Sequence, residues 1–295
     1  MNIIKLQALL QSFFLEDFGE GDLTSQALFS EEDHAEGIFT AKADGVFSGL
    51  DVLHQGYLLA NPSIQIRPMV KDGERIKKGQ DLFWVSGPVQ ALLSRERVLL
   101  NLVQRMSGIA TQTRQAVDTL CSDHTKITDT RKTVPGLRML DKYAVTTGGG
   151  SNHRFGLYDG VMIKDNHIEH CGSIRAAVEI AKSRLGHMAK IEVETECKAQ
   201  VLEAVHAGVD VIMFDNRTPE EVREFVPLVP DHIVTEASGG ISLDNLHAYS
   251  DTGVDYISLG YLTHSVTALD ISFNLIKGSV NHEYIGNDPH LTSAP

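Results

Sequence analysis

The sequence predicts an α/β protein in two parts, of which the second is an α/β barrel of the TIM type. Three observations favour this class. Short stretches of alternating polar and apolar residues, separated by turn residues, occur in the first third of the chain. From residue 126 onward, apolar strands alternate with amphipathic helices. Polar or charged side chains stand at the end of nearly every one of these later strands.

Composition limits the classes of partner and the location that the protein can have. The chain has 295 residues, of which 42% are hydrophobic and 22% charged, as in globular proteins with a sizeable core. Its formal net charge of -13 disfavours nucleic acid or an anionic membrane as a partner, because both need a basic face. No stretch is apolar enough to span a membrane. The cysteines Cys121, Cys171 and Cys197 form no C-x-x-C pair, so we expect reduced thiols in a cytoplasmic protein.

The N-terminal residues 1–22 predict an amphipathic helix rather than a signal peptide. Apolar residues such as Leu10 and Phe14 recur at helical spacing, but Gln7 and Gln11 interrupt the run. Acidic residues follow, without a small-residue cleavage site.

The first part of the chain predicts a domain over residues 1–112. Residues 37–49 and 64–87 have strand patterns, and 64–87 resemble in shape the small sandwich modules that carry lipoyl groups. Pro88 suits the first turn of a helix. Helical spacing then continues, which predicts a long helix that links this domain to a second one, residues 113–269.

The second domain predicts an incomplete barrel, because six or seven strands are fewer than the eight of a complete one. The clear strands are residues 126–130, 160–164, 190–194, 209–215, 232–238 and 254–260. The polar residues at their ends are Asp129, Arg131, Lys164, Glu194, Asp215, Glu236, Ser238, Ser258 and Gly260. In a barrel these ends converge on one mouth, whereas in an open sheet they would lie along a line.

Cations are concentrated between residues 128 and 168 of this acidic chain. They are Arg131, Lys132, Arg138, Lys142, Arg154 and Lys164, together with His153 and His167. Such a concentration predicts a small, highly negative ligand, although any one of these cations could belong to a solvated charged face.

Small residues could bind a phosphate. Residues 148–150 are three glycines, which form either a flexible loop or a backbone anion cradle. Residues 236–241 and 258–265 place small residues after late strands, where barrel enzymes often bind phosphate.

Glu194 and Asp215 are carboxylates at neighbouring strand ends in an otherwise cationic mouth. They either balance the cations or hold ribose hydroxyls or a Mg²⁺ ion that bridges phosphates. His153 is either a packed histidine or a charged donor to an anion. Residue spacing alone does not name the reaction.

Several segments together resemble the quinolinate phosphoribosyltransferases, also called carboxylating nicotinate-nucleotide pyrophosphorylases. These segments include EDFGEGDLTS, RERVLLNLVQRMSGIAT, TDTRKTVPGLR, GGGSNHR, IKDNH, IMFDN and EASGGI, in order over residues 16–265. Tyr261 departs from the family, which usually has a small alanine there.

The resemblance implies an N-terminal open α/β sandwich and a C-terminal incomplete α/β barrel, with residues 270–295 returning to the first domain. It implies that quinolinate and phosphoribosyl pyrophosphate give nicotinate mononucleotide, pyrophosphate and CO₂ in de novo NAD biosynthesis, with Mg²⁺. It also implies a homodimer whose sites combine the barrel of one chain with the N-terminal domain of the other. The polar residues 278–295 are expected to be partly disordered.

The resemblance also assigns roles by position. Arg131, Arg154 and Lys164, with His153 beside them, would bind the two carboxylates, and Arg97 would enter from the partner subunit. The remaining expected site residues are Thr130, Lys132, Glu194, Asp215, Ser238, Gly239, Gly240, Ser258 and Gly260. Of these, Lys132, Glu194 and Asp215 are the expected catalytic residues, and Glu194 and Asp215 the candidate Mg²⁺ ligands.

Three alternatives remain at this point. One is a phosphoribosyltransferase-like relative associated with molybdate transport, which tends to lose the full KDNH segment that is intact here at residues 164–167. The second is an aldolase that uses Lys164 as a Schiff-base nucleophile. The third is a non-catalytic anion sensor.

Overall fold

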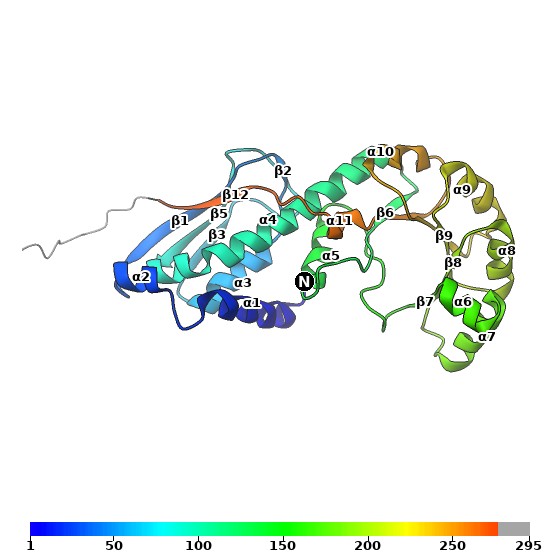
Figure 1. Cartoon of the computed structure of the whole chain (residues 1–295). Coiled ribbons are helices and arrows are strands. Elements are labelled where there is room, and N and C mark those ends of the chain that lie inside the picture. The colour runs from blue at the N-terminus through cyan, green and yellow to red at the C-terminus, as the bar shows by residue number, and fades with distance from the viewer. Residues whose placement is uncertain (277–295) are drawn as a thin grey trace, which may run out of the picture.

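The computed structural model describes residues 1–276 of the chain. The expectation for residues 278–295 therefore lies outside the described part. Two lobes stand side by side, and the long helix α4 (Val89–Leu120) runs between them (Figure 1). Among the described residues, no helix combines the length and apolar character needed to cross a bilayer. All three cysteines are free, as the sequence predicts.

The first lobe is built on a four-stranded antiparallel sheet with the order β12-β1-β5-β3. Its strands are β1 (His34–Ala41), β3 (Gln65–Pro68), β5 (Asp81–Pro88) and β12 (Ile271–Ile276). A two-stranded ribbon joins β2 (Gly45–Val46) to β4 (Arg75–Ile76). The helices are α1 (Ile3–Phe18), α2 (Leu23–Leu28) and α3 (Leu50–Ala60), together with the first half of α4.

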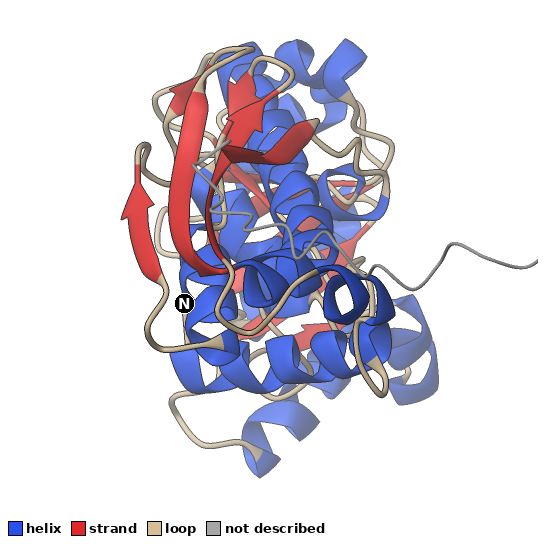
Figure 2. Cartoon of the chain, turned by 90° about the vertical axis from the view of Figure 1, so that its left-hand side faces the viewer, coloured by secondary structure: helices blue, strands red, loops and turns tan. Residues whose placement is uncertain are grey.

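Alternation along the strands decides which face of this sheet is covered. Phe83 and Val85 of β5 are fully buried, whereas Trp84 between them is only partly buried. Trp84 donates its indole N–H to Glu36 at 3.0 Å on the other face. The strands and the helices that pack on one of their faces are seen in Figure 2. This arrangement is the open α/β sandwich that the resemblance implies.

The predicted N-terminal helix is confirmed as α1. Leu6, Leu10 and Phe14, spaced four residues apart, form its buried stripe. Asn2 caps the helix by accepting a hydrogen bond from the Lys5 amide at 3.1 Å.

Residues 64–87 do not form a separate sandwich module, which corrects that expectation. Strands β3 and β5 belong to the main sheet, and β4 pairs with β2 instead. Pro88 ends β5 and precedes the first helical residue, Val89, by one position. Because α4 is a single helix, the expected boundary between residues 112 and 113 falls inside it.

The second lobe contains six parallel strands in the described part of the chain, in the order β6-β11-β10-β9-β8-β7. They are β6 (Lys126–Thr128), β7 (Val161–Ile163), β8 (Ile191–Thr195), β9 (Val211–Asp215), β10 (Val234–Ser238) and β11 (Tyr256–Ser258). This is the predicted incomplete barrel, because β6 and β7 lie at opposite ends of the order and share no ladder.

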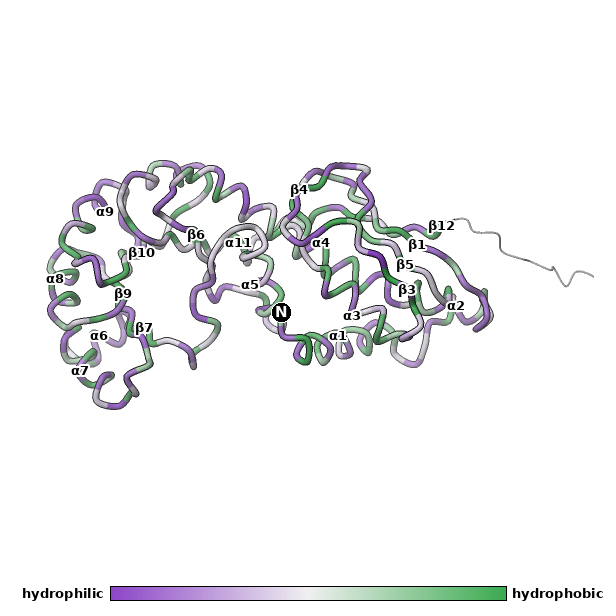
Figure 3. The backbone as a smooth tube through the Cα atoms, turned by 180° about the vertical axis from the view of Figure 1, so that it is seen from behind, coloured by the Kyte–Doolittle hydropathy of each residue, from purple (hydrophilic) through white to green (hydrophobic). Residues whose placement is uncertain are grey.

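Helices form the outer layer of the barrel, and hydrophobic and hydrophilic residues alternate along them (Figure 3). The helices are α5 (Arg138–Thr147), α6 (Asp165–Cys171), α7 (Ile174–Arg184), α8 (Lys198–Ala207), α9 (Pro219–Phe225), α10 (Leu243–Leu246) and α11 (Tyr261–His264). Two 3₁₀ turns, η1 (Val226–Leu228) and η2 (His247–Tyr249), complete the layer.

After the barrel the chain returns to the first lobe, where β12 pairs antiparallel with β1. The ring of Phe273 lies 4.8 Å from that of Phe39, between ring centroids. Phe273 also packs over Gly37, where a Cβ atom would lie 2.2 Å from the ring. A glycine is needed at this position because the ring occupies the space of a side chain.

Candidate functional site

A cavity of about 600 Å³ opens at the carboxyl ends of the barrel strands. The sequence-predicted residues that line it are Thr130, Arg131, Lys132, His153, Arg154, Lys164, Glu194, Asp215, Ser238, Gly239, Gly240 and Ser258. Met162, Met213, Asn216 and Glu236 complete its wall. The mouth of the barrel therefore brings together all the predicted site residues except Arg97 and Gly260.

The period of two along each strand explains this convergence. Side chains at alternate positions point into the barrel, so Asp215 at the end of β9 and Ser238 at the end of β10 face the same cavity. Their Cα atoms are register partners, and Ser238 is also paired with Ser258 of β11. The Ser258 hydroxyl donates a hydrogen bond to the Ser238 hydroxyl at 2.7 Å.

Two carboxylates and a lysine stand on one side of the mouth. The Lys164 ammonium forms an ion pair with Glu194, which bridges the ends of β7 and β8. Asp215 accepts a hydrogen bond from the side-chain amide of Asn216 at 2.8 Å. Glu194 and Asp215 also line a small adjoining cavity of about 130 Å³. These oxygen atoms form a region of negative charge beside the cations.

Two arginines stand on the other side. Arg131 Nε is buried and has no hydrogen-bond partner within residues 1–276. Arg154 donates from Nη1 to the Gly160 carbonyl at 2.8 Å. Burial lowers the pKa of Arg154, and the charge of Arg131 lowers it further, which indicates that the two guanidinium groups are close. Two neighbouring cations with spare donors suit an anion.

His153 lines the cavity and also reaches buried carboxylates in the barrel interior. Its Nε2 lies 2.9 Å from Glu192 and 3.7 Å from Glu236, and its Nδ1 accepts the Arg154 amide hydrogen bond at 2.8 Å. Burial opposes a charge on the imidazole, but the hydrogen bond with Glu192 and the charge of Glu236 outweigh it and raise the pKa of His153. Both ring nitrogens thus contact the protein itself, and His153 joins the barrel interior to Arg154.

Glu192 and Glu236 both lie next to His153 inside the barrel, and of the two only Glu236 lines the cavity within the described residues. Both carboxylates are buried, and each keeps one oxygen without a hydrogen-bond partner among the described residues. Burial raises the pKa of Glu236 to about 8, with a further contribution from the charge of Glu192. The charged form of Glu236 is thus disfavoured by burial and by Glu192, and His153 opposes this shift.

This shift predicts a pH dependence of stability. Glu236 has an ordinary pKa of 4.5 when unfolded and about 8 when folded. Between these values the folded state holds a proton that the unfolded state releases, so stability should fall as pH rises from 4.5 to 8. Glu236→Gln should flatten the slope by up to about 1.4 kcal/mol per pH unit, the limit for one proton. Urea unfolding at several pH values between 4.5 and 8 measures this slope.

The matched control for this experiment is Glu169→Gln, which changes an exposed glutamate of α6. It should leave the slope as in the unsubstituted chain. Equal slopes for the Glu236→Gln variant and the unsubstituted chain would show that Glu236 titrates as an ordinary carboxyl group.

The loop that carries Lys132 rests on the turn after β11. Thr263 donates its hydroxyl to the Lys132 carbonyl at 2.9 Å. A Cβ atom at Gly260 would lie 2.9 Å from Cδ of Lys132. Gly260 does not line the cavity itself but leaves room for the lysine that does.

The loop after β10 requires its glycines. Gly239 and Gly240 have φ angles of 86° and 67°, which favour glycine. A Cβ atom at Gly239 would also lie 2.2 Å from Oδ1 of Asn216. Asn216 itself adopts a positive φ of 54°, and its amide donates to the Ser238 carbonyl at 2.8 Å.

The three glycines 148–150 are neither a flexible loop nor an anion cradle, which corrects both sequence-based interpretations. They end α5, and their amides donate to the carbonyls of Ala144, Thr146 and Val145. A Cβ atom at Gly148 would lie 2.5 Å from the Ala110 carbonyl of α4. The run is glycine because the end of α5 packs closely against α4.

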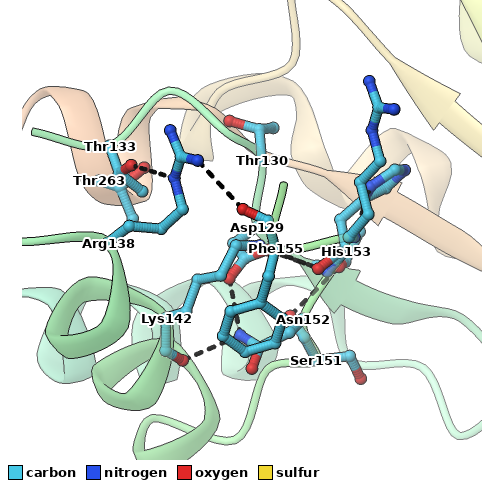
Figure 4. Close-up of polar contacts among 12 residues, drawn as sticks. Asp129, Thr130, Thr133, Arg138, Lys142, Ser151, Asn152, His153, Phe155 and Thr263 are labelled. Atoms are coloured by element: carbon cyan, nitrogen blue, oxygen red, sulfur yellow. Dashed lines mark hydrogen bonds and ion pairs between the residues drawn. The ribbon is translucent and has the colours of Figure 1, made fainter. Parts of the chain in front are cut away.

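Three cations of the basic stretch do not line the cavity, so the prediction that the whole stretch binds a ligand was too broad. Lys142 is fully buried and forms an ion pair with Asp129. Arg138 donates to Thr133 and to the Phe155 carbonyl (Figure 4). His167 accepts the Lys164 amide hydrogen bond at the start of α6.

Arg97 and Tyr261 also lie outside the cavity lining. Arg97 is exposed on α4, in the first lobe. Tyr261 packs against the hydrophobic core, and burial of its hydroxyl raises its pKa to about 12. The departure at Tyr261 therefore does not place a phenol group against the ligand cavity.

Sequence reasoning did not assign Glu192 or Asn216 to the site, and it placed Glu236 at the mouth without giving it a role. The position of Glu192 was predictable, because Glu192 and Glu194 are two residues apart on one strand and must face the same side. The same spacing relates Glu236 to Ser238. Asn216 follows a strand end and is a residue type that tolerates a positive φ.

The fold and the cavity define a class: an α/β barrel enzyme with a charged site at the carboxyl ends of its strands. The sequence also matches the N-terminal domain of the quinolinate phosphoribosyl transferase family over residues 22–107 and the C-terminal domain over residues 109–274.

Relatives and solved structures agree with this match. The chain is 56% identical over 275 residues to the probable carboxylating nicotinate-nucleotide pyrophosphorylase of Bacillus subtilis, covering 93% of this chain and 95% of that one. It is 39% identical over 271 residues to the protein of the same description from Synechocystis, covering 91% and 92%. The crystal structure of NadC from Streptococcus pyogenes superposes with a TM-score of 0.90 at 36% identity, covering 94% and 99%. The chain belongs to the quinolinate phosphoribosyltransferase family.

Proposed function

We propose that this chain transfers the phosphoribosyl group of phosphoribosyl pyrophosphate to quinolinate with loss of CO₂, giving nicotinate mononucleotide and pyrophosphate in de novo NAD biosynthesis. The convergence of the family-type residues on one cavity at the barrel mouth carries this proposal. A cavity of about 600 Å³ suits a small ligand, since such sites commonly measure 300–1,000 Å³.

Quinolinate has two carboxylates, and we assign their binding to Arg131, Arg154 and Lys164. The free Nε of Arg131 and the guanidinium of Arg154 offer forked donors for a carboxylate. Lys164 adds a point charge from the opposite wall. His153 holds the backbone of Arg154 and so acts on this site through its neighbour.

We assign the sugar-phosphate donor to the other part of the mouth. The 5-phosphate would lie against Ser238, Gly239, Gly240 and Ser258, with Thr130 and Lys132 close to the pyrophosphate and Gly260 leaving room for Lys132. Glu194 and Asp215 would hold the ribose hydroxyls.

The donor set also fits Mg²⁺, which prefers carboxylate and phosphate oxygens. Glu194 and Asp215 present carboxylates to the same cavity, and both could share the ion with the substrate phosphates. When bound, Mg²⁺ would supply positive charge that stabilises the departing pyrophosphate. Removal of the ion by a chelator should abolish turnover.

The residues of the chain then account for the rest of the reaction. Positive charge that develops at the ribose carbon is stabilised by the carboxylates of Glu194 and Asp215. The arginines fix the pyridine nitrogen on the line of attack. The pyridinium that forms is an electron sink, which makes loss of the adjacent carboxylate as CO₂ feasible without an organic cofactor, and a proton from water then replaces it on the ring carbon.

A homodimer that shares its sites, with Arg97 contributed by the partner subunit, belongs to the same proposal. So does a cytoplasmic location. The exposure of Arg97 on α4 supports the first point, because its side chain is available to a second subunit. Size-exclusion chromatography with light scattering tests the homodimer, and cell fractionation tests the cytoplasmic location.

The test of the function is release of CO₂ from quinolinate labelled in its 2-carboxylate. Release should require phosphoribosyl pyrophosphate and Mg²⁺, and nicotinate mononucleotide should form in equal amount. A folded dimer that binds phosphoribosyl pyrophosphate but releases no CO₂ would favour an anion sensor or the molybdate-associated relative. Borohydride trapping of a carbonyl compound on Lys164 would favour the aldolase.

A further inference from the structure

The barrel has an open seam between β6 and β7, and a buried polar cluster lies along it. Within residues 1–276, the edge of β6 that does not pair with β11 carries a single parallel bridge, between Thr128 and Ser151. Ser151 donates its amide to the Ile127 carbonyl at 2.8 Å and accepts from the Asp129 amide at 3.2 Å. In a complete barrel a hydrogen-bonded strand would occupy this edge.

Beyond this bridge, the Asp129 carboxylate accepts the hydrogen bonds that join the two sides of the seam in place of strand pairing. Asp129 is fully buried and accepts hydrogen bonds from three donors (Figure 4). These are the Lys142 ammonium, the Asn152 side-chain amide at 2.7 Å and the His153 backbone amide at 2.9 Å. Lys142 also donates to the His153 carbonyl, and Asn152 to the Lys142 carbonyl, both at 2.9 Å.

Stability alone is a weak reason for this cluster to be charged. Burial raises the pKa of Asp129 and lowers that of Lys142, so each charge is disfavoured by its surroundings and held by the other. The ring of Phe155 lies over the Lys142 ammonium, 5.2 Å from its centroid, and so replaces water on that side. Buried ion pairs of this kind are often no more stabilising than apolar side chains of similar size.

The position of the cluster suggests another role. Asp129 is followed directly by Thr130, Arg131 and Lys132, and His153 is followed by Arg154. The loops that carry both arginines of the cavity are thus held together at a single buried carboxylate. A hydrogen-bonded network of this kind fixes side-chain geometry more tightly than apolar packing does.

We propose that Asp129, Lys142 and Asn152 are positioning residues that replace the missing strand pairing at the seam and set the spacing of Arg131 and Arg154 for a dicarboxylate. Asp129 and Lys142 do not line the cavity, so they act through the arginines. The inference rests on the proposed function for the identity of the ligand.

The test compares two double variants in the full-length protein. Asp129→Ala with Lys142→Met removes both charges and the common acceptor. Asp129→Asn with Lys142→Met also removes both charges but keeps an acceptor for the His153 amide. Removing both members of the pair avoids an unpaired buried charge, which favours folding of both variants.

We expect kcat/KM for quinolinate to fall about 100-fold in the Ala/Met variant, the loss typical of an error of about 1 Å in placement. The Asn/Met variant should recover at least about 10-fold of this loss. The KM for phosphoribosyl pyrophosphate should change less than that for quinolinate in both variants, because its 5-phosphate loop follows β10, which does not pair with β6 in the described residues. Hydrogen exchange at the amides of residues 151–154 should accelerate in the Ala/Met variant.

Val178→Ala is the matched control, because Val178 is fully buried in α7 and takes no part in the cluster. It should lower the melting temperature without changing quinolinate binding or exchange at residues 151–154. A folded Ala/Met variant that binds quinolinate as the unsubstituted chain does would overturn the inference. If the unsubstituted chain itself fails to bind quinolinate, the proposed function fails first, and this inference fails with it.

Discussion

Arg131→Ala is expected to weaken the binding of quinolinate by at least about 30-fold while the protein stays folded. Arg131 follows β6 and lines the cavity, and its buried Nε has no hydrogen-bond partner among the described residues. Truncating one member of a buried, hydrogen-bonded charge pair costs about 2–5 kcal/mol of binding free energy, or a factor of about 30 to several thousand in Kd. Isothermal titration calorimetry with quinolinate, beside a thermal unfolding curve, measures both quantities.

Two further variants separate the causes. Arg131→Lys keeps the positive charge but loses the planar fork, so it should bind quinolinate with an affinity between those of the unsubstituted chain and the alanine variant. Arg184→Ala removes the same side chain from the exposed end of α7 and should bind as the unsubstituted chain does. An unchanged Kd for Arg131→Ala would remove Arg131 from the site.

Arg97→Ala and Lys164→Ala are each expected to inactivate the enzyme and to restore activity when their chains are mixed. Lys164 lies in the barrel cavity, whereas Arg97 is exposed on α4 and does not line the cavity of its own chain. Loss of a charged donor from a reaction site typically lowers kcat by about 100-fold or more. In a mixed dimer, one site would combine the intact barrel of the Arg97→Ala chain with Arg97 from the Lys164→Ala chain.

The number of complete sites in a mixed dimer sets how much activity is restored. One of the two sites in each mixed dimer is complete, so purified heterodimers should show about half of the activity of the unsubstituted dimer. Two affinity tags allow their isolation. A mixture of the Lys164→Ala chain with an Arg131→Ala chain is the control, because both residues line the same barrel and each site would still lack one of them. Heterodimers as inactive as that control would place Arg97 outside a shared site.

The order of the elements was predictable because it depends on local patterns. Apolar residues at a spacing of four, as at Leu6, Leu10 and Phe14, predict a helix regardless of its partners. Apolar runs between amphipathic helices predict parallel strands, and all six expected barrel strands are present. The convergence of strand-end residues such as Asp215 and Ser238 then follows from barrel geometry.

Directions of side chains within the barrel mouth were harder to predict. Lys142 and Arg131 both belong to the basic stretch, yet Lys142 is buried in an ion pair with Asp129, whereas Arg131 lines the cavity. Nothing in the local sequence distinguishes them, because the difference depends on a carboxylate that reaches Lys142 only after β6 and α5 have packed together. The roles of residues 148–150 depend in the same way on the close approach of α4.

The sequence by itself determined the barrel strands, the barrel class and most of the residues at the mouth, because periodicity and strand ends are properties of neighbouring residues. Only the tertiary structure decided which charges are neutralised inside and which remain for a ligand. That division depends on contacts between segments far apart in the chain, such as Asp129 with Lys142 and His153 with Glu192 and Glu236. Burial at those contacts fixes the protonation and the direction of each group, and therefore the charge that the cavity presents.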